Sequence, residues 1–179
     1  MRLSRVAFLV ASTWATILGG PATVQAETTE KDIQVAARAV AFMENAPSGD
    51  TPAAIIYDPA NGATKAEAEA IQKAMGAGLK AGNANLQPKL VAVGSLGDLA
   101  GARVAFVTGG LGAQHGAIFA AAAPKSILTV STDMSCVDAG KCVVGVMTQP
   151  KVEIIVSKAA RDASSISFAA AFLMMVKEK

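Results

Sequence analysis

The chain has 179 residues, of which 52% are apolar, 17% charged and 4% aromatic, and its formal net charge is +2. This length predicts one domain, and the high apolar fraction with little net charge excludes a disordered chain and a nucleic-acid-binding surface. One histidine and two cysteines leave little material for a metal site or a histidine-based active site.

The first 26 residues have the pattern of a secretory signal peptide. Arg2 and Arg5 precede an apolar run at residues 6–18, and Ala26 ends a cleavage motif. The run has about 13 residues and is too short to cross a bilayer, which needs about 20. We expect cleavage before Glu27 and export to the periplasm, as a mature chain with no integral membrane segment. Its net charge is near zero, because both arginines are removed.

The mature chain, residues 27–179, is predicted to be one domain in which helices and strands alternate. Apolar residues at helical spacing predict a first helix over residues 32–45, with Thr29 or Asp32 as its N-cap. A second helix, from residue 64 to about 79, is expected to start with a capping box made by Thr64 and Glu67. The other elements expected in this part are strands at 53–57, 90–93, 103–107 and 127–130, and a helix from 115 or 117 to 123.

After residue 130 the pattern changes to a hairpin, with strands at 142–147 and 152–156. Residues 158–177 are then predicted as a helix whose apolar residues form core, or dock a partner or a second copy of the chain. Strands that alternate with helices favour a mostly parallel sheet covered on both faces. The predicted fold class is therefore α/β: a single Rossmann-like or flavodoxin-like three-layer domain with a C-terminal hairpin and helix.

Residues 109–116 form a glycine-rich turn between a strand and a helix. A dinucleotide fingerprint would lie there, but the G-x-G-x-x-G spacing that starts at Gly110 places His115, not glycine, at its last position. Asp133 follows the next strand, about where a ribose-binding acid belongs. We interpret the glycines as those of a tight turn and expect no cofactor.

The chain offers little for catalysis. His115 could pair with Ser95, Ser131 or Ser135, but the sequence has no G-x-S-x-G motif and no acid placed to orient the ring. A metal site is not expected, because there is no C-x-x-C motif and only one histidine. Asp58, after the first strand, either contacts a ligand or forms an Asx-turn. We predict a binding protein, not an enzyme.

Cys136 and Cys142 flank a polar loop, residues 137–141. In an exported chain with only two cysteines we expect a disulfide between them. A loop this short stabilises the folded chain by roughly 2 kcal/mol on the chain-entropy estimate. The functional alternative is a redox switch.

Several short segments occur in the order and spacing of one known family. They are residues 32–37, 53–59, 127–131, 143–146, 152–156 and 164–167. With these segments the chain resembles the YfiR/HmsC-like family of exported proteins. The resemblance implies an α/β periplasmic protein that binds the sensor region of an inner-membrane diguanylate cyclase, and so represses cyclic-di-GMP synthesis and biofilm output. A homodimer is a further hypothesis.

The alternative function is a solute-binding module. Residues 54–79 comprise a strand, a turn and a helix, and they are similar to one lobe of the periplasmic substrate-binding proteins of ABC transporters. Those proteins have two lobes around a cleft, and this chain has room for one.

Overall fold

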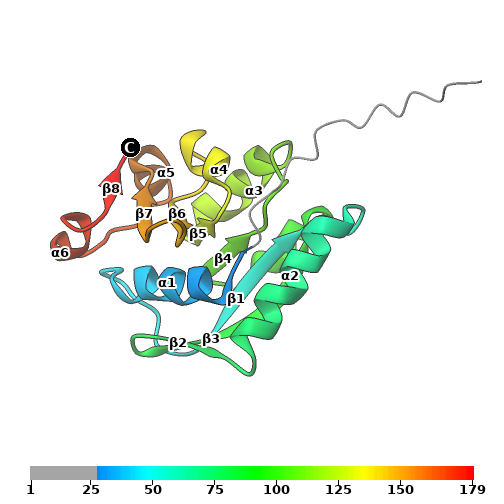
Figure 1. Cartoon of the computed structure of the whole chain (residues 1–179), viewed down its shortest axis with the longest axis horizontal. Helices are drawn as coiled ribbons and strands as arrows, with labels where there is room; N and C mark the ends of the chain where they lie inside the picture. The colour runs from blue at the N-terminus through cyan, green and yellow to red at the C-terminus, as the bar shows by residue number, and fades with distance from the viewer. Residues whose placement is uncertain (1–27) are drawn as a thin grey trace, which may run out of the picture.

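One mixed sheet organises the chain (Figure 1). The computed structural model describes residues 28–179, so the expected signal peptide lies outside the described residues. The strands are β1 (Gly49–Tyr57), β2 (Leu79–Ala81), β3 (Ala84–Ala92), β4 (Val104–Val107), β5 (Leu128–Ser131), β6 (Val144–Met147), β7 (Glu153–Val156) and β8 (Lys177–Glu178). Their order across the sheet is β2-β3-β1-β4-β5-β6-β7-β8.

Helices connect these strands. They are α1 (Glu30–Ala41), α2 (Gly62–Met75), α3 (His115–Ala122), α4 (Met134–Asp138), α5 (Lys158–Ala163) and α6 (Ala170–Leu173), with 3₁₀ helices η1 (Val93–Leu99) and η2 (Ala123–Lys125). No helix among residues 28–179 is long and apolar enough to cross a membrane.

The centre of the sheet is parallel. β1 pairs in parallel with β3 and with β4, and β4, β5 and β6 continue in parallel. The expected hairpin is confirmed, because β6 and β7 are antiparallel. The strands β3 and β1 are nine residues each, longer than the runs expected at 90–93 and 53–57.

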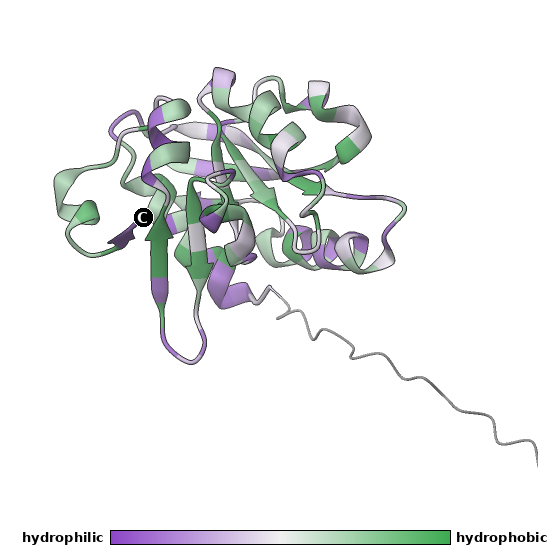
Figure 2. Cartoon of the chain, turned by 90° about the horizontal axis from the view of Figure 1, so that it is seen from above, coloured by the Kyte–Doolittle hydropathy of each residue, from purple (hydrophilic) through white to green (hydrophobic). Residues whose placement is uncertain are grey.

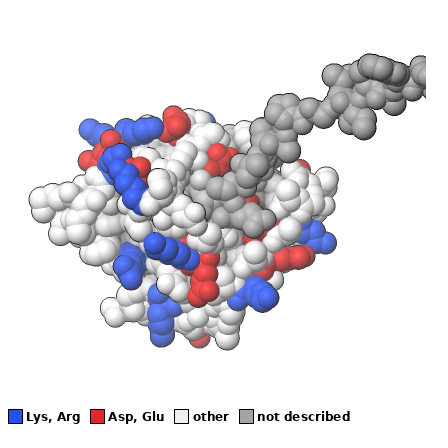
Figure 3. Space-filling view, viewed as in Figure 1, with Lys and Arg blue, Asp and Glu red and all other residues white. Residues whose placement is uncertain are grey.

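The sheet is covered on both faces, as its apolar strands require. Alternate residues of β1 face opposite sides: Ile55 belongs to a core with α1, α2 and the C-terminal segment, whereas Ile56 belongs to a core with η1, α3 and α4. In Figure 2 the strands between the helical layers are predominantly apolar. The predicted α/β class with a mostly parallel sheet is confirmed. On the face shown in Figure 3, basic and acidic side chains are interspersed.

The capping prediction for the first helix is confirmed. Thr29 caps α1, its hydroxyl accepting the Asp32 N–H, and the Asp32 carboxylate accepts the Thr29 N–H at 2.8 Å. This capping box places an acid in the first turn, where it also opposes the positive end of the helix dipole.

The expected capping box of the second helix is wrong. α2 begins earlier, at Gly62, because the Asn61 side chain accepts the Ala63 N–H at 3.0 Å, and asparagine is as strong an N-cap as threonine or better. The Thr64 hydroxyl instead binds back to the backbone of Asp58. α2 also ends earlier than expected, at Met75, because Gly76 has a φ of 57°.

The prediction of one helix over residues 158–177 is also wrong. α5 ends at Ala163, and Ser165 then adopts a left-handed φ of 51°. Phe168 forms an isolated β-bridge with Met43, and Phe172 packs with its ring centroid 5.0 Å from that of Phe42. Ile166, Phe168 and Phe172 are buried as core residues, whereas Met174 and Met175 are exposed. Contacts with Phe42 and Met43, far away in sequence, hold this segment in place of a continuous helix.

Candidate functional site

The chain reverses direction across the sheet at β1. From β1 it crosses through α2 to β3 on one side, and from β3 it crosses through η1 to β4 on the other. α2 and η1 belong to opposite cores, so the two crossovers cover opposite faces. In open α/β sheets a ligand binds where such connections diverge, outside the carboxyl ends of the strands. The loops after β1 and β4 therefore mark a candidate site, which we call the carboxyl edge.

Glu67 of α2 joins the loops at this edge. One of its carboxylate oxygens accepts the Gly109 N–H at 2.9 Å, and the other accepts the Thr28 hydroxyl. The Thr28 hydroxyl also lies 2.7 Å from that of Thr132, which follows β5. The sequence assigned Glu67 to a helix cap, so this role was missed. Its position on the first half of the helix after β1, facing the neighbouring strand end, is the signal that could have found it.

The glycine-rich turn after β4 leaves the start of α3 open. Gly110 has a φ of 77°, the left-handed conformation that favours glycine, so the tight-turn interpretation is confirmed at this position. Gln114, at the N-cap, makes no side-chain cap bond. Within residues 28–179 no acceptor binds the N–H of Gly116 or Ala117, and both residues are exposed. A helix start of this kind presents unpaired donors and the positive end of the helix dipole.

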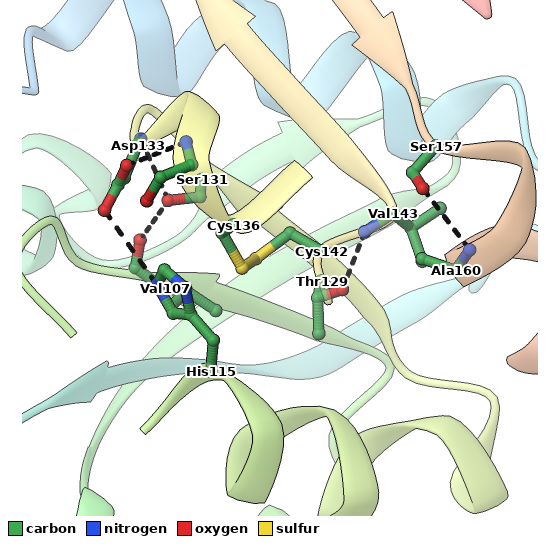
Figure 4. Close-up of a disulfide and its surroundings, with 11 residues drawn as sticks. Val107, His115, Thr129, Ser131, Asp133, Cys136, Cys142, Val143, Ser157 and Ala160 are labelled. Atoms are coloured by element: carbon green, nitrogen blue, oxygen red, sulfur yellow. Dashed lines mark hydrogen bonds and ion pairs between the residues drawn. A yellow bond between two sulfur atoms is a disulfide. The ribbon is translucent and has the colours of Figure 1, made fainter. Parts of the chain in front are cut away.

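His115, the first residue of α3, faces Asp133 at this edge (Figure 4). Its Nε2 lies 3.9 Å from the Asp133 Oδ2, too far for a hydrogen bond. The residue is only 5% exposed, and within residues 28–179 Nε2 is the one fully buried side-chain nitrogen or oxygen without a partner. Burial lowers the pKa of His115, and the Asp133 carboxylate opposes this shift by a smaller amount. The imidazole is therefore neutral at pH 7.

The Asp133 carboxylate has one oxygen engaged and one open. Its Oδ1 caps α4 by accepting the Ser135 N–H at 2.9 Å. Its Oδ2 accepts no hydrogen bond from another described residue, and the side chain is 20% exposed. The edge thus offers an open carboxylate oxygen on the β5 loop and open N–H donors on the β4 loop, with His115 between them.

Within the described residues no hydrogen bond joins the His115 ring to Ser95, Ser131 or Ser135. The Ser131 hydroxyl donates to the Val107 carbonyl at 2.8 Å and accepts the Asp133 N–H at 3.0 Å, so both of its roles are structural. Ser135 contributes its backbone N–H to the α4 cap, and Ser95 lies in η1. Asp58 forms the Asx-turn that the sequence offered as one alternative, its Oδ1 accepting the Ala60 N–H at 2.9 Å.

Cys136 and Cys142 form a disulfide with a Cα–Cα distance of 5.2 Å. Both cysteines are fully buried in the core that contains α3 and α4, so the bond joins α4 to the segment before β6 (Figure 4). No group of three or more His, Cys, Asp or Glu residues in the described chain could hold a metal ion.

One small cavity is lined by residues of this edge. It has a volume of about 10 Å³ and lies between α1 and the sheet, with Thr28, Asp32 and Thr132 among its lining residues. About one water molecule fits such a volume.

No protein-family model matches the chain, and no curated protein matches it. Several solved structures are similar in fold, among them the following three. The first is a ligand-free, open substrate binding protein with adhesive properties from Clostridium difficile (TM-score 0.57, 10% identity, 72% of this chain and 54% of the other). The second is a conserved domain protein from Vibrio cholerae (TM-score 0.60, 10% identity, 83% and 59%).

The third is an ABC domain in complex with L-Trp from Streptococcus pneumoniae (TM-score 0.56, 9% identity, 83% and 59%). At these identities the likeness shows the fold alone, an α/β fold of the kind found in binding proteins. The chain spans between 54% and 59% of the length of these three chains.

Proposed function

We propose that this protein is a solute-binding module whose site is the carboxyl edge. The observation that carries the proposal is the pair of unsatisfied groups found there, the buried Nε2 of His115 and the open Oδ2 of Asp133, beside the uncapped start of α3. Buried polar groups are nearly always partnered in folded proteins, so an unpartnered one at a strand-crossover point favours a role with a ligand. The solved structures of binding proteins with this fold support the same function.

The chemistry of the edge favours a small polar solute with a hydrogen-bond donor at one end and an acceptor at the other. Asp133 can accept from an amine or hydroxyl, and the N–H groups of Gly116 and Ala117 can donate to a carboxylate or carbonyl oxygen. Amino acids have this pair of groups, and L-Trp is the ligand of one protein of similar fold. The Ser131 hydroxyl is engaged in two hydrogen bonds, which supports binding without catalysis.

A thermal-shift screen tests this function, with L-Trp, other amino acids and neutral solutes as probes. A solute that binds the folded chain raises its melting temperature in a concentration-dependent way. We expect Asp133→Asn to abolish the shift while keeping the α4 cap, because asparagine caps as well as aspartate does. Asp162→Asn, on exposed α5, is the matched control.

A second pair of variants tests the open helix start. Ala117→Pro removes one free N–H in the first turn of α3, where proline is tolerated, and Ala117→Ser keeps it. The proline variant should lose the ligand-dependent shift and the serine variant should retain it. The proposal fails if no solute in the panel shifts the melting temperature, or if the shift is the same in Asp133→Asn as in the wild type.

The periplasm is the compartment that we propose for this function. The signal-peptide pattern at residues 1–26 and the disulfide between Cys136 and Cys142 support export, because disulfides persist in oxidising compartments. Fractionation followed by mass measurement tests it: the periplasmic chain should begin at Glu27. A full-length chain in the cytoplasm would contradict it.

The second candidate function is the regulator that the YfiR/HmsC-like resemblance implies. The observation that favours it is an exposed apolar surface near the C-terminus, where Met174 and Met175 are 82% and 67% exposed and Phe42 is 36% exposed. Methionine-rich surfaces are adaptable protein-binding surfaces. A membrane pull-down with the wild type and with Met174→Ser plus Met175→Ser tests this function. Recovery of a diguanylate cyclase by the wild type alone would support the regulator over the solute-binding module.

A further inference from the structure

A cleft lies at the opposite edge of the sheet, where the parallel strands begin. Its volume is about 260 Å³. Asn45 precedes β1, Arg103 precedes β4 and Ser126 precedes β5. The cleft is therefore lined by the segments that lead into three neighbouring strands. Ser165 and Ser167, from the segment between α5 and α6, close its other side. We call it the amino-edge cleft.

Two serines of this cleft have an unusual backbone conformation. Ser126 and Ser165 have φ values of 52° and 51°, and within residues 28–179 they are the only non-glycine residues with a positive φ. Each follows a helix end: Ser126 is the C-cap of η2, and Ser165 follows Ser164, the C-cap of α5. Glycine is the usual residue at such positions, because a side chain there is strained.

The backbone of these serines closes a helix end, but their hydroxyls have no partner within the described chain. The Ile127 N–H donates to the Ala122 carbonyl and the Ile166 N–H to the Arg161 carbonyl, as at helix ends closed by a left-handed residue. The hydroxyls of Ser126, Ser165 and Ser167 form no hydrogen bond with another described residue. Three hydroxyls that line one cleft are therefore available to a ligand.

Arg103 provides the charge of the cleft. One of its guanidinium nitrogens donates to the Asn45 carbonyl oxygen at 3.2 Å, which fixes the side chain, and no described carboxylate lies within ion-pair distance of it. Asp50 accepts the side-chain amides of Asn85 and Gln87, and Asp162 pairs with Arg161. Glu44, between the lining residues Met43 and Asn45, is exposed.

The remaining N–H groups of Arg103 form the planar fork that suits an oxyanion.

The rest of the lining is apolar. Met43 and Ile166 are 6% and 5% exposed and contribute the hydrophobic wall of the cleft. Ligand pockets usually have volumes of about 300–1,000 Å³, so this cleft suits only a small molecule. We propose that the amino-edge cleft binds a small organic anion, with its oxyanion head on Arg103 and the serine hydroxyls and its short apolar body against Met43 and Ile166.

This site is independent of the carboxyl edge. The probes are benzoate, phenyl phosphate and the uncharged benzyl alcohol, titrated into the mature chain by calorimetry. We expect saturable binding of at least one anion and none of benzyl alcohol. Binding of benzoate alone identifies a carboxylate head, and binding of phenyl phosphate alone identifies a phosphate head.

Charge variants test the head group. Arg103→Gln should weaken anion binding tenfold or more, because a charge-assisted bidentate contact is lost. Arg38→Gln, on α1 outside the cleft lining, should leave it unchanged. The proposal is overturned if neither anion binds, if benzyl alcohol binds as tightly as the anions, or if Arg103→Gln binds like the wild type.

Serine variants separate strain from binding. Ser165→Gly relieves the strain of the left-handed backbone and removes the hydroxyl. It should therefore raise the melting temperature and lower the affinity for the anion. Ser165→Ala removes the hydroxyl and keeps the strain, so it should lower affinity without raising the melting temperature. If Ser165→Gly keeps full affinity, the serine has no role in the ligand site and the proposed contact is overturned.

Discussion

Replacement of Glu67 should loosen the carboxyl edge, because its carboxylate holds two loops to α2. It accepts the Gly109 N–H at 2.9 Å and the Thr28 hydroxyl. Hydrogen bonds to a charged group contribute about 1.5–3 kcal/mol each when buried, and partial exposure of Glu67 reduces this. We expect Glu67→Ala to lower the free energy of unfolding by about 2 kcal/mol, which lowers the melting temperature by roughly 4–8 °C for a chain of this size.

Urea denaturation measures the loss of stability in Glu67→Ala, and amide hydrogen exchange measures the loosening of the loop at Gly109. Glu69→Ala is the matched control, because Glu69 lies two residues along the same helix and is exposed. Exchange of the Gly109 amide should accelerate tenfold or more in Glu67→Ala and stay unchanged in Glu69→Ala. If the two variants have the same stability and the same Gly109 exchange rate, the carboxylate does not hold the loop and this account of the edge is wrong.

The remaining predictions concern the disulfide, the histidine and the C-terminal core. Replacing both Cys136 and Cys142 by serine should cost about 2 kcal/mol or more in urea denaturation, and an unchanged midpoint would contradict a structural role. Because burial lowers the pKa of His115, the unfolded chain binds the proton first. The free energy of unfolding should therefore fall as the pH drops below the ordinary value of 6.5, and His115→Gln should lose this slope. Phe172→Ala should cost about 3–5 kcal/mol in thermal unfolding, whereas Met174→Ala, at an 82% exposed residue, should change stability by under about 0.5 kcal/mol. Equal losses of stability in Phe172→Ala and Met174→Ala would contradict the assignment of Phe172 to the core.

The fold class could be predicted from the sequence because its signals are local. Apolar runs bounded by glycine and proline marked β1, β4, β5 and the β6–β7 hairpin close to their observed positions. The short elements β2, η1, α4 and β8 were missed, since elements of two to seven residues are too short for a periodic pattern. The last helix was overpredicted, because the burial of Phe168 and Phe172 depends on contacts with Phe42 and Met43 across the whole chain.

The candidate site could be predicted only in pieces. The glycine-rich turn, His115 and Asp133 were each singled out, but as parts of a cofactor motif or a catalytic pair that the chain does not complete. Parallel strands bring the ends of β4 and β5 together, and this pairing places Asp133 beside His115. The spacing of residues along the chain does not predict this proximity, because the proximity depends on the order of the strands in the sheet.

The backbone conformation could be predicted from the sequence at the carboxyl edge of the sheet but not at its amino edge. At the carboxyl edge, glycine stands where the backbone needs it, so Gly110 is recognisable in the sequence as a turn. At the amino edge, serine stands at Ser126 and Ser165 where glycine would relieve strain, and no sequence rule assigns a left-handed conformation to serine. Both left-handed serines close a helix end through their backbone, which glycine would do without strain. What serine adds is a hydroxyl, and both hydroxyls line a cleft that contains Arg103, whose guanidinium has no described carboxylate within ion-pair distance. Binding of the proposed anion is therefore the gain that offsets the strain at these two positions.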